Sequence, residues 1–272
     1  MEGGRLSSDS ELLVEVRDDI AILTLNRPRA RNAFSEKMLQ AMSSTLQELD
    51  ENEGIRCVIV RGAGDRAFSV GMDLRAMIDS TPEENVRQIS SEVAPLRSAI
   101  AAIEEARCPV VAMIRGFALG AACELAVACD LRVGSEKSRM GMPPGRLGIV
   151  YPPEGLRRFL RALGPAGTRK LFLTAQYFGA EEAGEIGLLD YVVPDSSLED
   201  FTLELAGKIA GNAPLSGAGH KKALRMLARS TELTEDERSQ LEALSVEAFA
   251  SEDAREGLAA FSEKREPEFK GR

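Results

Sequence analysis

The stretch that decides the fold runs from Arg115 to Asp130 and reads RGFALGAACELAVACD. The apolar run before it, from Pro109 to Ile114, is short, rich in β-branched residues and bounded by proline and glycine, which predicts a buried strand. Small residues then form a turn, and the nearly apolar segment from Cys123 to Cys129 predicts a buried helix. Glu124 is the one charged residue of that segment and lies in the first turn of the predicted helix.

A helix that begins in this way has two properties that are useful in catalysis. Its first backbone N–H groups have no partner within the helix, and small residues let a ligand approach them, so they can stabilise a developing oxyanion. A carboxylate in apolar surroundings is costly to ionise, which raises its pKa toward the range of acid–base catalysis. The structural alternative is that Glu124 only caps the first turn, where a carboxylate is favoured.

A second turn of small residues, AFSVGMDL from Ala67 to Leu74, follows another predicted strand. Together with Gly116 to Asp130 it resembles the two signature segments of the crotonase family, also called the enoyl-CoA hydratase/isomerase family. The resemblance runs from about Leu13 to Lys270. It includes Leu25-Asn26-Arg27-Pro28, Arg31-Asn32-Ala33 and the tail from Ser251 to Phe269.

This resemblance implies an α/β fold with a crotonase-like ββα spiral core and a helical C-terminal portion. We expect residues 1–194 to form the core with the CoA-thioester site. Residues 195–272 are then a helical oligomerisation region, because relatives form trimers or pairs of trimers. The expected assembly is therefore a homotrimer or hexamer.

The resemblance also implies an acyl-CoA thioester as substrate and a thioester enolate as intermediate, so an enzyme of hydratase or isomerase type. By position, the backbone N–H groups of Met72 and Ala121 form the oxyanion hole. The family usually has more glycine where this chain has Ala121 and Ala122, so the turn must either avoid positive φ there or be strained. Coenzyme A enters as part of the substrate, and no separate cofactor is expected.

The largest departure from the family pattern concerns the second catalytic carboxylate. Hydratases of the family hold one water between two glutamates, and Glu124 falls on the first position while Pro144 stands at the second. One carboxylate is enough for double-bond isomerisation, which only moves a proton between two carbons. Other candidate partners are Glu154, Tyr151 and Asp73, which have the structural alternatives of capping a helix, filling a loop and tying down a turn.

Pro144 also keeps other functions open. One alternative is different enolate chemistry on acyl-CoA, namely decarboxylation or thioester hydrolysis. Another is a catalytically weak acyl-CoA-binding or assembly protein, although such a binder has no need of a buried acid such as Glu124. Candidate CoA-binding cations are Arg31, Arg75 and Lys270, and a solvated surface charge is the alternative at each.

The composition and charge argue against a nucleic-acid-binding protein and against a membrane-spanning one. The chain has 272 residues, 44% hydrophobic and 28% charged, which is long enough for a large core. A net charge of −9 argues against a nucleic-acid-binding surface. The apolar stretch from Leu119 to Val133 is interrupted by charges, so no membrane span is expected. The polar N-terminus from Met1 to Glu11 has no targeting pattern, which predicts a cytoplasmic enzyme.

The histidine, cysteine and glycine patterns argue against a metal site or a bound redox cofactor. The single histidine, His220, has no partner histidine, and the cysteine spacings match no zinc pattern. We therefore interpret the cysteines as small buried hydrophobic residues: Cys57, Cys108, Cys123 and Cys129. The segment from Gly62 to Gly64 lacks the rest of a dinucleotide fingerprint, so no nicotinamide or flavin is implied.

The remaining pattern changes from mixed strands and helices to helices alone near Pro194. Further expected elements before that point are strands at Leu12–Val16, Ile20–Asn26, Ile55–Val60 and Leu131–Val133, a helix from Ser35 to about Leu49, a helix entry at Thr81–Glu84 after a mobile flap, an irregular loop at Met140–Pro153, and helices at Glu154–Leu163 and Pro165–Thr174. Helices are expected after it at Leu198–Ala210, Lys221–Ser230, Glu235–Ala250 and Asp253–Lys264.

Overall fold

The larger of two sheets has the strand order β1-β2-β3-β5-β7-β10. The computed structural model describes residues 10–73, 82–147 and 150–229, and beyond them 234–236, 239–240, 252–253, 256, 263, 265 and 267–272. Neighbouring strands of this sheet are parallel except β1, which forms an antiparallel hairpin with β2. Its strands are β1 (Leu12–Arg17), β2 (Ile20–Leu25), β3 (Cys57–Gly62), β5 (Val110–Ile114), β7 (Leu131–Ser135) and β10 (Tyr191–Val193).

The smaller sheet has four strands of three residues each, in the order β4-β6-β8-β9. The first three are parallel, and β9 closes the edge antiparallel to β8. These strands are β4 (Ala67–Ser69), β6 (Phe117–Leu119), β8 (Arg139–Gly141) and β9 (Tyr177–Gly179). The sequence pattern did not predict them, because three residues are too few to show an alternation of apolar and polar side chains.

The two sheets are connected by a repeated order of elements. A strand of the large sheet leads to a short strand of the small sheet and then to a helix, in the series β3-β4-α2, β5-β6-α3 and β7-β8-α4. The helices are α1 (Glu36–Glu51), α2 (Pro82–Glu105), α3 (Ala121–Ala128), α4 (Pro153–Thr174), α5 (Ala180–Glu185), α6 (Leu198–Ala210) and α7 (Pro214–Arg229). This is the ββα spiral that the resemblance implies.

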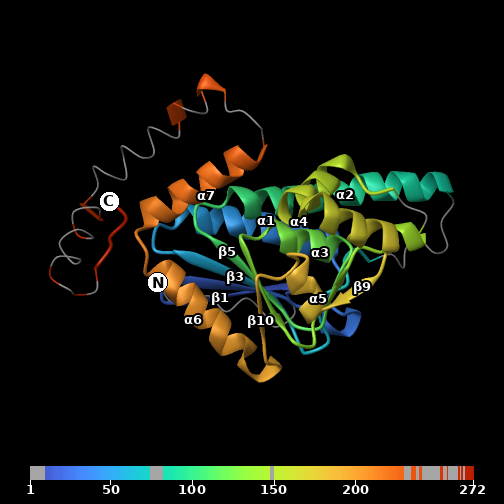
Figure 1. Cartoon of the computed structure of the whole chain (residues 1–272), viewed down its shortest axis with the longest axis horizontal. Helices are drawn as coiled ribbons and strands as arrows, with labels where there is room; N and C mark the ends of the chain where they lie inside the picture. The colour runs from blue at the N-terminus through green and yellow to red at the C-terminus, as the bar shows by residue number, and fades with distance from the viewer. Residues whose placement is uncertain are drawn as a thin grey trace.

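Helices cover both faces of the large sheet (Figure 1). The helices α1, α2 and α3 lie on one face, around a core that includes Leu23, Val58 and Val110. On the other face α6 packs on side chains from β2, β3, β5 and β7, such as Ile59 and Val111. Because α6 completes the core, the division expected after residue 194 does not separate this helix from the sheet.

Local signals explain why α1 and α4 lie where they do. Ser35 caps α1 by accepting a hydrogen bond from the backbone N–H of Met38 at 3.1 Å, as the sequence predicts. The apolar face of α1 is buried, and removing these side chains from water stabilises the packing of the helix on the sheet. In α4, Gly164 has φ +65°, which kinks the helix between the two segments that the sequence predicts.

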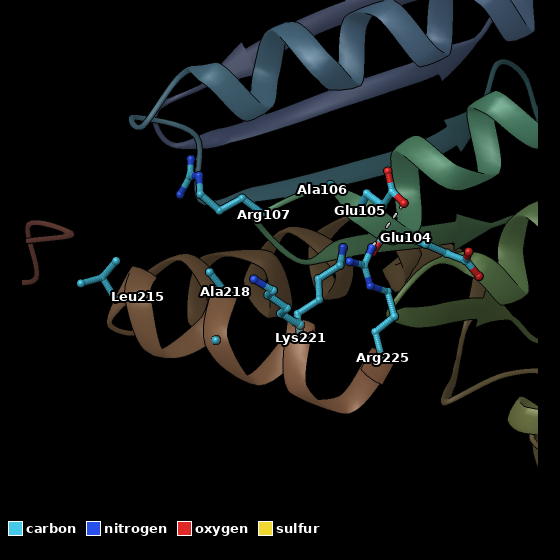
Figure 2. Close-up of a pocket in the computed structure, with 10 residues that line it drawn as sticks. Glu104, Glu105, Ala106, Arg107, Leu215, Ala218, Lys221 and Arg225 are labelled. Carbon is cyan, nitrogen blue, oxygen red and sulfur yellow. Dashed lines mark hydrogen bonds and ion pairs between the residues drawn. The ribbon is translucent and has the colours of Figure 1, made fainter. Parts of the chain in front are cut away.

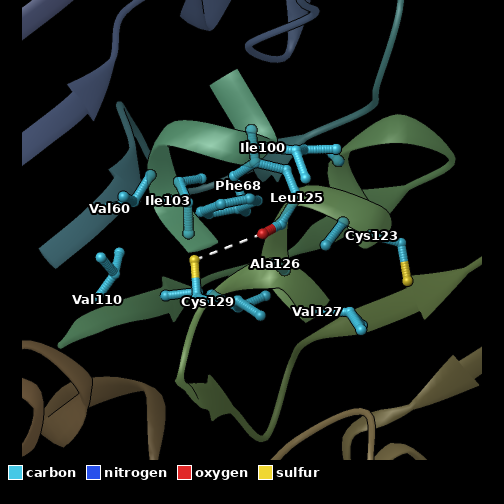
Figure 3. Close-up of a cluster of buried hydrophobic side chains, with 14 of the residues drawn as sticks. Val60, Phe68, Ile100, Ile103, Val110, Cys123, Leu125, Ala126, Val127 and Cys129 are labelled. Carbon is cyan, nitrogen blue, oxygen red and sulfur yellow. Dashed lines mark hydrogen bonds between the residues drawn. The ribbon is translucent and has the colours of Figure 1, made fainter. Parts of the chain in front are cut away.

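The helix α3 is enclosed by the core, as its apolar sequence predicts. Leu125 and Ala126 are fully buried and lie near Phe68, Ile100 and Ile103 (Figure 3). The thiol of Cys129 donates a hydrogen bond of 3.5 Å to the carbonyl of Leu125 at the end of the helix. A charged side chain on this helix must therefore find its partners inside the protein.

Some expected boundaries differ from the structure. Strand β3 ends two residues later than expected, and α3 begins at Ala121, two residues before the apolar run that predicted it. Helix α7 begins at Pro214, because proline is well tolerated in a first helical turn and the small residues after it do not break the helix. The expected flap before Thr81 and most of the two last predicted helices lie outside the described residues.

Candidate active site

The first part of the candidate site is the turn between β6 and α3. Gly120 has φ +56° and precedes the first helical residue, Ala121. The first backbone N–H that donates within the helix is that of Glu124, at 3.1 Å from the carbonyl of Gly120. The N–H groups of the preceding turn therefore have no partner within the helix. Positive φ falls on Gly120 and spares Ala121 and Ala122, so the reduced number of glycines causes no strain.

The second part is the turn at Gly71 and Met72. Gly71 has φ +86°, and a Cβ atom there would lie 2.6 Å from the carbonyl oxygen of Leu119 and 3.1 Å from the nitrogen of Ala121. The two turns are thus in contact, and only glycine fits at this position. Met72 forms an isolated parallel bridge with Phe34, in which the N–H of Phe34 donates to the carbonyl of Gly71 at 2.7 Å. In such a bridge Phe34 bonds to the residues that flank Met72 and not to Met72 itself, so the N–H of Met72 points away from Phe34.

Glu124 is held by two hydrogen-bond donors. Its side chain lies inside the protein, with the residue 6% exposed. One carboxylate oxygen accepts a hydrogen bond from the hydroxyl of Tyr151, in the loop before α4, and the other accepts from Nη1 of Arg158, on α4, at 2.5 Å. The position of Gly155 is part of the same packing, since a Cβ atom there would lie 2.4 Å from Cε1 of Tyr151 and 3.0 Å from Oε1 of Glu124.

Arg158 also binds a second carboxylate. Its Nε lies 2.8 Å from Oε1 of Glu104, near the end of α2, and its Nη2 lies 3.3 Å from Oε2 of the same residue. The guanidinium group therefore presents one edge to Glu104 and its remaining nitrogen to Glu124. Glu104, Arg158, Glu124 and Tyr151 form one chain of contacts, named here the Glu124 cluster, which joins α2, α3 and α4.

Burial and the neighbouring groups act in opposite directions on the proton affinity of Glu124. Burial raises the pKa of Glu124 above its ordinary value, while the Tyr151 hydroxyl and Arg158 favour the carboxylate and limit the rise. The pKa of Tyr151 lies well above its ordinary value, first because of burial and then because of the adjacent carboxylate. Tyr151 therefore keeps its proton and donates it in the hydrogen bond to Glu124.

The structure brings Tyr151, and neither Glu154 nor Asp73, to Glu124. Helix α4 begins at Pro153, so Glu154 lies in its first turn, where its side chain is 65% exposed and pairs with Arg97 at 3.3 Å. The expectation that Glu154 is the catalytic partner thus has no support from its position. Asp73 forms an ion pair of 3.3 Å with Arg27.

Pro144, at the position where the resemblance implies the second carboxylate, begins a 3₁₀ turn that ends at Leu147.

Two of the three predicted CoA-binding cations, Arg31 and Lys270, lie within the described residues. Arg31 is exposed in a tight turn with φ +51°, after the 3₁₀ turn at Pro28–Ala30. Lys270 is exposed, and its backbone N–H donates to Asp253 at 2.6 Å. Arg75 lies outside the described residues. Contact of these cations with CoA stays a prediction.

One pocket of the described structure lies away from the two glycine turns. It opens between the end of α2 and α7, and Glu104, Glu105, Arg107, Lys221 and Arg225 are among the residues that line it (Figure 2). The Nζ of Lys221 lies 2.8 Å from Asp130 and donates to the carbonyls of Ile103 and Cys108, which ties α7 to the core. Glu104 is thus at the edge of this pocket as well as in the Glu124 cluster.

The described residues give no sign of a metal site or of a membrane-spanning helix. Within those ranges, no three histidine, cysteine, aspartate or glutamate side chains group as metal ligands. The four cysteines are free and buried, as the sequence predicts, and burial raises the pKa of Cys123 to about 12. A search of the described residues finds no helix with the length and apolar character needed to cross a membrane.

Comparison with known proteins identifies the class to which this fold and site belong. The family model described as Enoyl-CoA hydratase/isomerase matches residues 15–272. The 2,3-dehydroadipyl-CoA hydratase of Escherichia coli is 33% identical over 97% of this chain and 100% of its own length. The methylmalonyl-CoA decarboxylase of the same organism is 32% identical over 93% of this chain and 95% of its own length.

A solved structure gives the same result. The crystal structure of an enoyl-CoA hydratase from Bacillus anthracis matches with a TM-score of 0.87 and 32% identity, over 96% of this chain and 100% of that chain. The chain belongs to the enoyl-CoA hydratase/isomerase family. It is an enzyme with the crotonase fold, acting on acyl-CoA thioesters.

Proposed function

We propose that this enzyme forms the enolate of an acyl-CoA thioester, with the thioester oxygen bound by the N–H groups of Met72 and Ala121. The observation that carries the proposal is the contact between the turn at Gly71 and the turn at Gly120. The second turn leads into α3, where Ala121 lies three residues before the buried Glu124. A thioester oxygen gains negative charge when the enolate forms. Fixed N–H groups then stabilise the transition state more than the bound substrate.

Glu124 is the proposed proton-transfer group. It is on the same helix as Ala121 and three residues further on, so both lie on one side of α3. Its raised pKa brings the carboxyl closer to the working range of a general acid–base catalyst. The Tyr151 hydroxyl is the proposed second polar group of the site, because it is bonded to the carboxylate and keeps its proton.

We propose double-bond isomerisation rather than hydration as the main reaction. Isomerisation needs one base that removes a proton from C2 of a 3-enoyl thioester and returns a proton to C4. Hydration by the family mechanism needs a second carboxylate to bind the water, and Pro144 stands at that position. A site with one glutamate therefore has the groups for the first reaction and lacks one for the second.

Decarboxylation is the second candidate, favoured by the same observation. Loss of CO₂ from an alkylmalonyl thioester forms the enolate without a base. The site then needs only the oxyanion hole and one acid to protonate C2. A protonated Glu124 supplies that acid, and the absence of a carboxylate at position 144 avoids repulsion with an anionic substrate.

A single experiment decides among these reactions. The protein is incubated with 3-enoyl-, 2-enoyl-, 3-hydroxyacyl- and alkylmalonyl-CoA, and the products are identified by mass spectrometry and NMR. The proposal expects 2-enoyl-CoA from 3-enoyl-CoA at a higher rate than hydration of 2-enoyl-CoA. Faster hydration than isomerisation would contradict it, and CO₂ release would favour the second candidate.

The homotrimeric or hexameric state, the CoA contacts and the cytoplasmic location are also proposals. Exposed apolar side chains on and beside α4 and α7 support an assembly, among them Val150, Leu173 and Leu224. Light scattering at micromolar concentration should give a multiple of three chains. Arg31→Ala and Lys270→Ala should weaken binding of a non-reactive acyl-CoA, with a smaller effect in added salt.

A further inference from the structure

Glu104 is connected to the proposed proton-transfer group by an arginine that both carboxylates share. Arg158 binds Glu104 through two nitrogens, at 2.8 and 3.3 Å, and Glu124 through a third, at 2.5 Å. The side chains of Arg158 and Glu104 are 17% and 22% exposed, so both are largely enclosed, and Glu104 also lines the pocket between α2 and α7. Figure 2 shows the Glu104 side chain pointing away from Lys221.

The charges of the Glu124 cluster do not cancel when both glutamates are ionised. Two carboxylates and one guanidinium group then leave one net negative charge, whereas the cluster is neutral when Glu124 carries a proton. Without Glu104, the sum would be zero with Glu124 ionised and positive with Glu124 protonated. A buried cation without a partner is costly, so Arg158 alone would hold Glu124 in the ionised form.

We propose that Glu104 is a positioning residue that occupies Arg158, so that Arg158 does not hold Glu124 in the ionised form and Glu124 can take up and release one proton. The inference rests on the proposed function only for its effect on turnover. It does not require Glu104 to touch the substrate. It explains why a carboxylate paired with arginine can still serve as a proton acceptor.

The described side chains that most affect the proton affinity of Glu124 are the other members of the cluster. Arg158 from α4 and the Tyr151 hydroxyl favour the carboxylate, and Glu104 from α2 opposes it. The thiol of Cys123, next to Glu124 on α3, has a pKa of about 12 and carries no charge near neutrality. The proposal therefore predicts opposite effects for removing Glu104 and for removing Arg158.

The test is a direct titration of Glu124. The protein is labelled with ¹³C at the glutamate carboxyls, and the Glu124 resonance is assigned by its absence in Glu124→Gln. Glu104→Gln keeps the shape and the acceptor for Arg158 but removes the charge, so the Glu124 midpoint should fall. Arg158→Met should raise the midpoint by about one pH unit or more, because an adjacent cation is lost. The acid limb of kcat/KM should move in the same two directions.

Matched controls separate this role from simple packing. Glu105→Gln removes the neighbouring charge on α2, where the side chain is 63% exposed, and Arg157→Met removes the exposed neighbour of Arg158. Both should leave the Glu124 midpoint unchanged. Thermal melts establish that each variant is folded, and Arg158→Lys replaces Arg158→Met if the latter does not fold, with a smaller rise expected.

An unchanged or raised midpoint in Glu104→Gln would overturn the inference, and so would a lowered midpoint in the Arg158 variants. The titration uses no substrate, so it gives an answer even if every thioester is left unreacted. In that case the proposed reaction fails while the inference about Glu104 stands. If Glu104→Gln turns over normally and its Glu124 midpoint does not move, the inference about Glu104 fails while the proposed reaction stands.

Discussion

Replacing Glu124 by glutamine should abolish the proposed proton transfer and change little else in the structure. The amide oxygen can accept from Arg158, and the amide nitrogen can face Tyr151, whose hydroxyl can turn to accept. Arg158 also keeps both bonds to Glu104, so no buried cation loses its last partner. The substitution therefore tests chemistry rather than folding.

We expect turnover of the reactive thioester to fall by about 10²- to 10⁴-fold, the usual contribution of a general acid–base group, or about 3 to 5 kcal/mol in the activation barrier. The affinity for a non-reactive acyl-CoA should change little, because the proposed oxyanion hole consists of backbone N–H groups. Steady-state kinetics and calorimetry measure the two quantities. Full turnover in Glu124→Gln would refute the mechanism, and an equal loss in affinity would show that Glu124 acts in binding.

The stability of the same variant has a defined pH dependence. Since folding raises the pKa of Glu124, the folded state holds its proton more tightly than the unfolded state. The native protein therefore loses this contribution as the pH rises from the ordinary value of 4.5 through the folded pKa. Glutamine cannot ionise, so at pH 7 the variant should be at least as stable as the native protein, and the difference should narrow as the pH falls toward 4.5. A large loss of stability at pH 7, measured by denaturant unfolding, would contradict this reasoning.

Three further substitutions test the rest of the site. Glu154→Gln should leave turnover within about twofold, because this exposed surface pair contributes little, and a loss as large as that of Glu124→Gln would restore Glu154 as a partner. Gly155→Ala should lower turnover at least tenfold, because its Cβ would lie 2.4 Å from a ring carbon of Tyr151, and thermal melts would show whether the fold tolerates it. Pro144→Glu should raise hydration of 2-enoyl-CoA relative to isomerisation, and an unchanged product ratio would mean that position 144 does not face the substrate.

Sequence alone predicts the elements whose signals are local. The helix that begins after Ser35, the helix from Leu198 to Ala210 and the two strands on either side of Asp18 each have a signal in adjacent residues, and the structure confirms them. The glycine turns are also predictable, because positive φ at Gly71 and close backbone contact leave no other residue type.

The arrangement around Glu124 is not predictable in this way. Arg158 lies 34 residues after Glu124 and 54 residues after Glu104, and no local pattern joins them. Glu154 is the expected carboxylate in the loop region, but the start of α4 turns it toward Arg97. Gly155 is the one signal that sequence could have used, since a glycine in the first turn of a helix often marks a close approach.

The two halves of the candidate site respond differently to changes in sequence. The proposed oxyanion hole is made of backbone groups at Met72 and Ala121, so it depends on the fold and on Gly71 rather than on those side chains. The proton-transfer half is made of side chains from three helices and a loop, and one substitution there alters the charge of the whole cluster. In the proposed mechanism the backbone half therefore binds the thioester oxygen, whereas the side-chain half determines what happens to the enolate. The proposed mechanism therefore predicts that substitutions around Glu124 change the reaction while binding of the acyl-CoA thioester is retained.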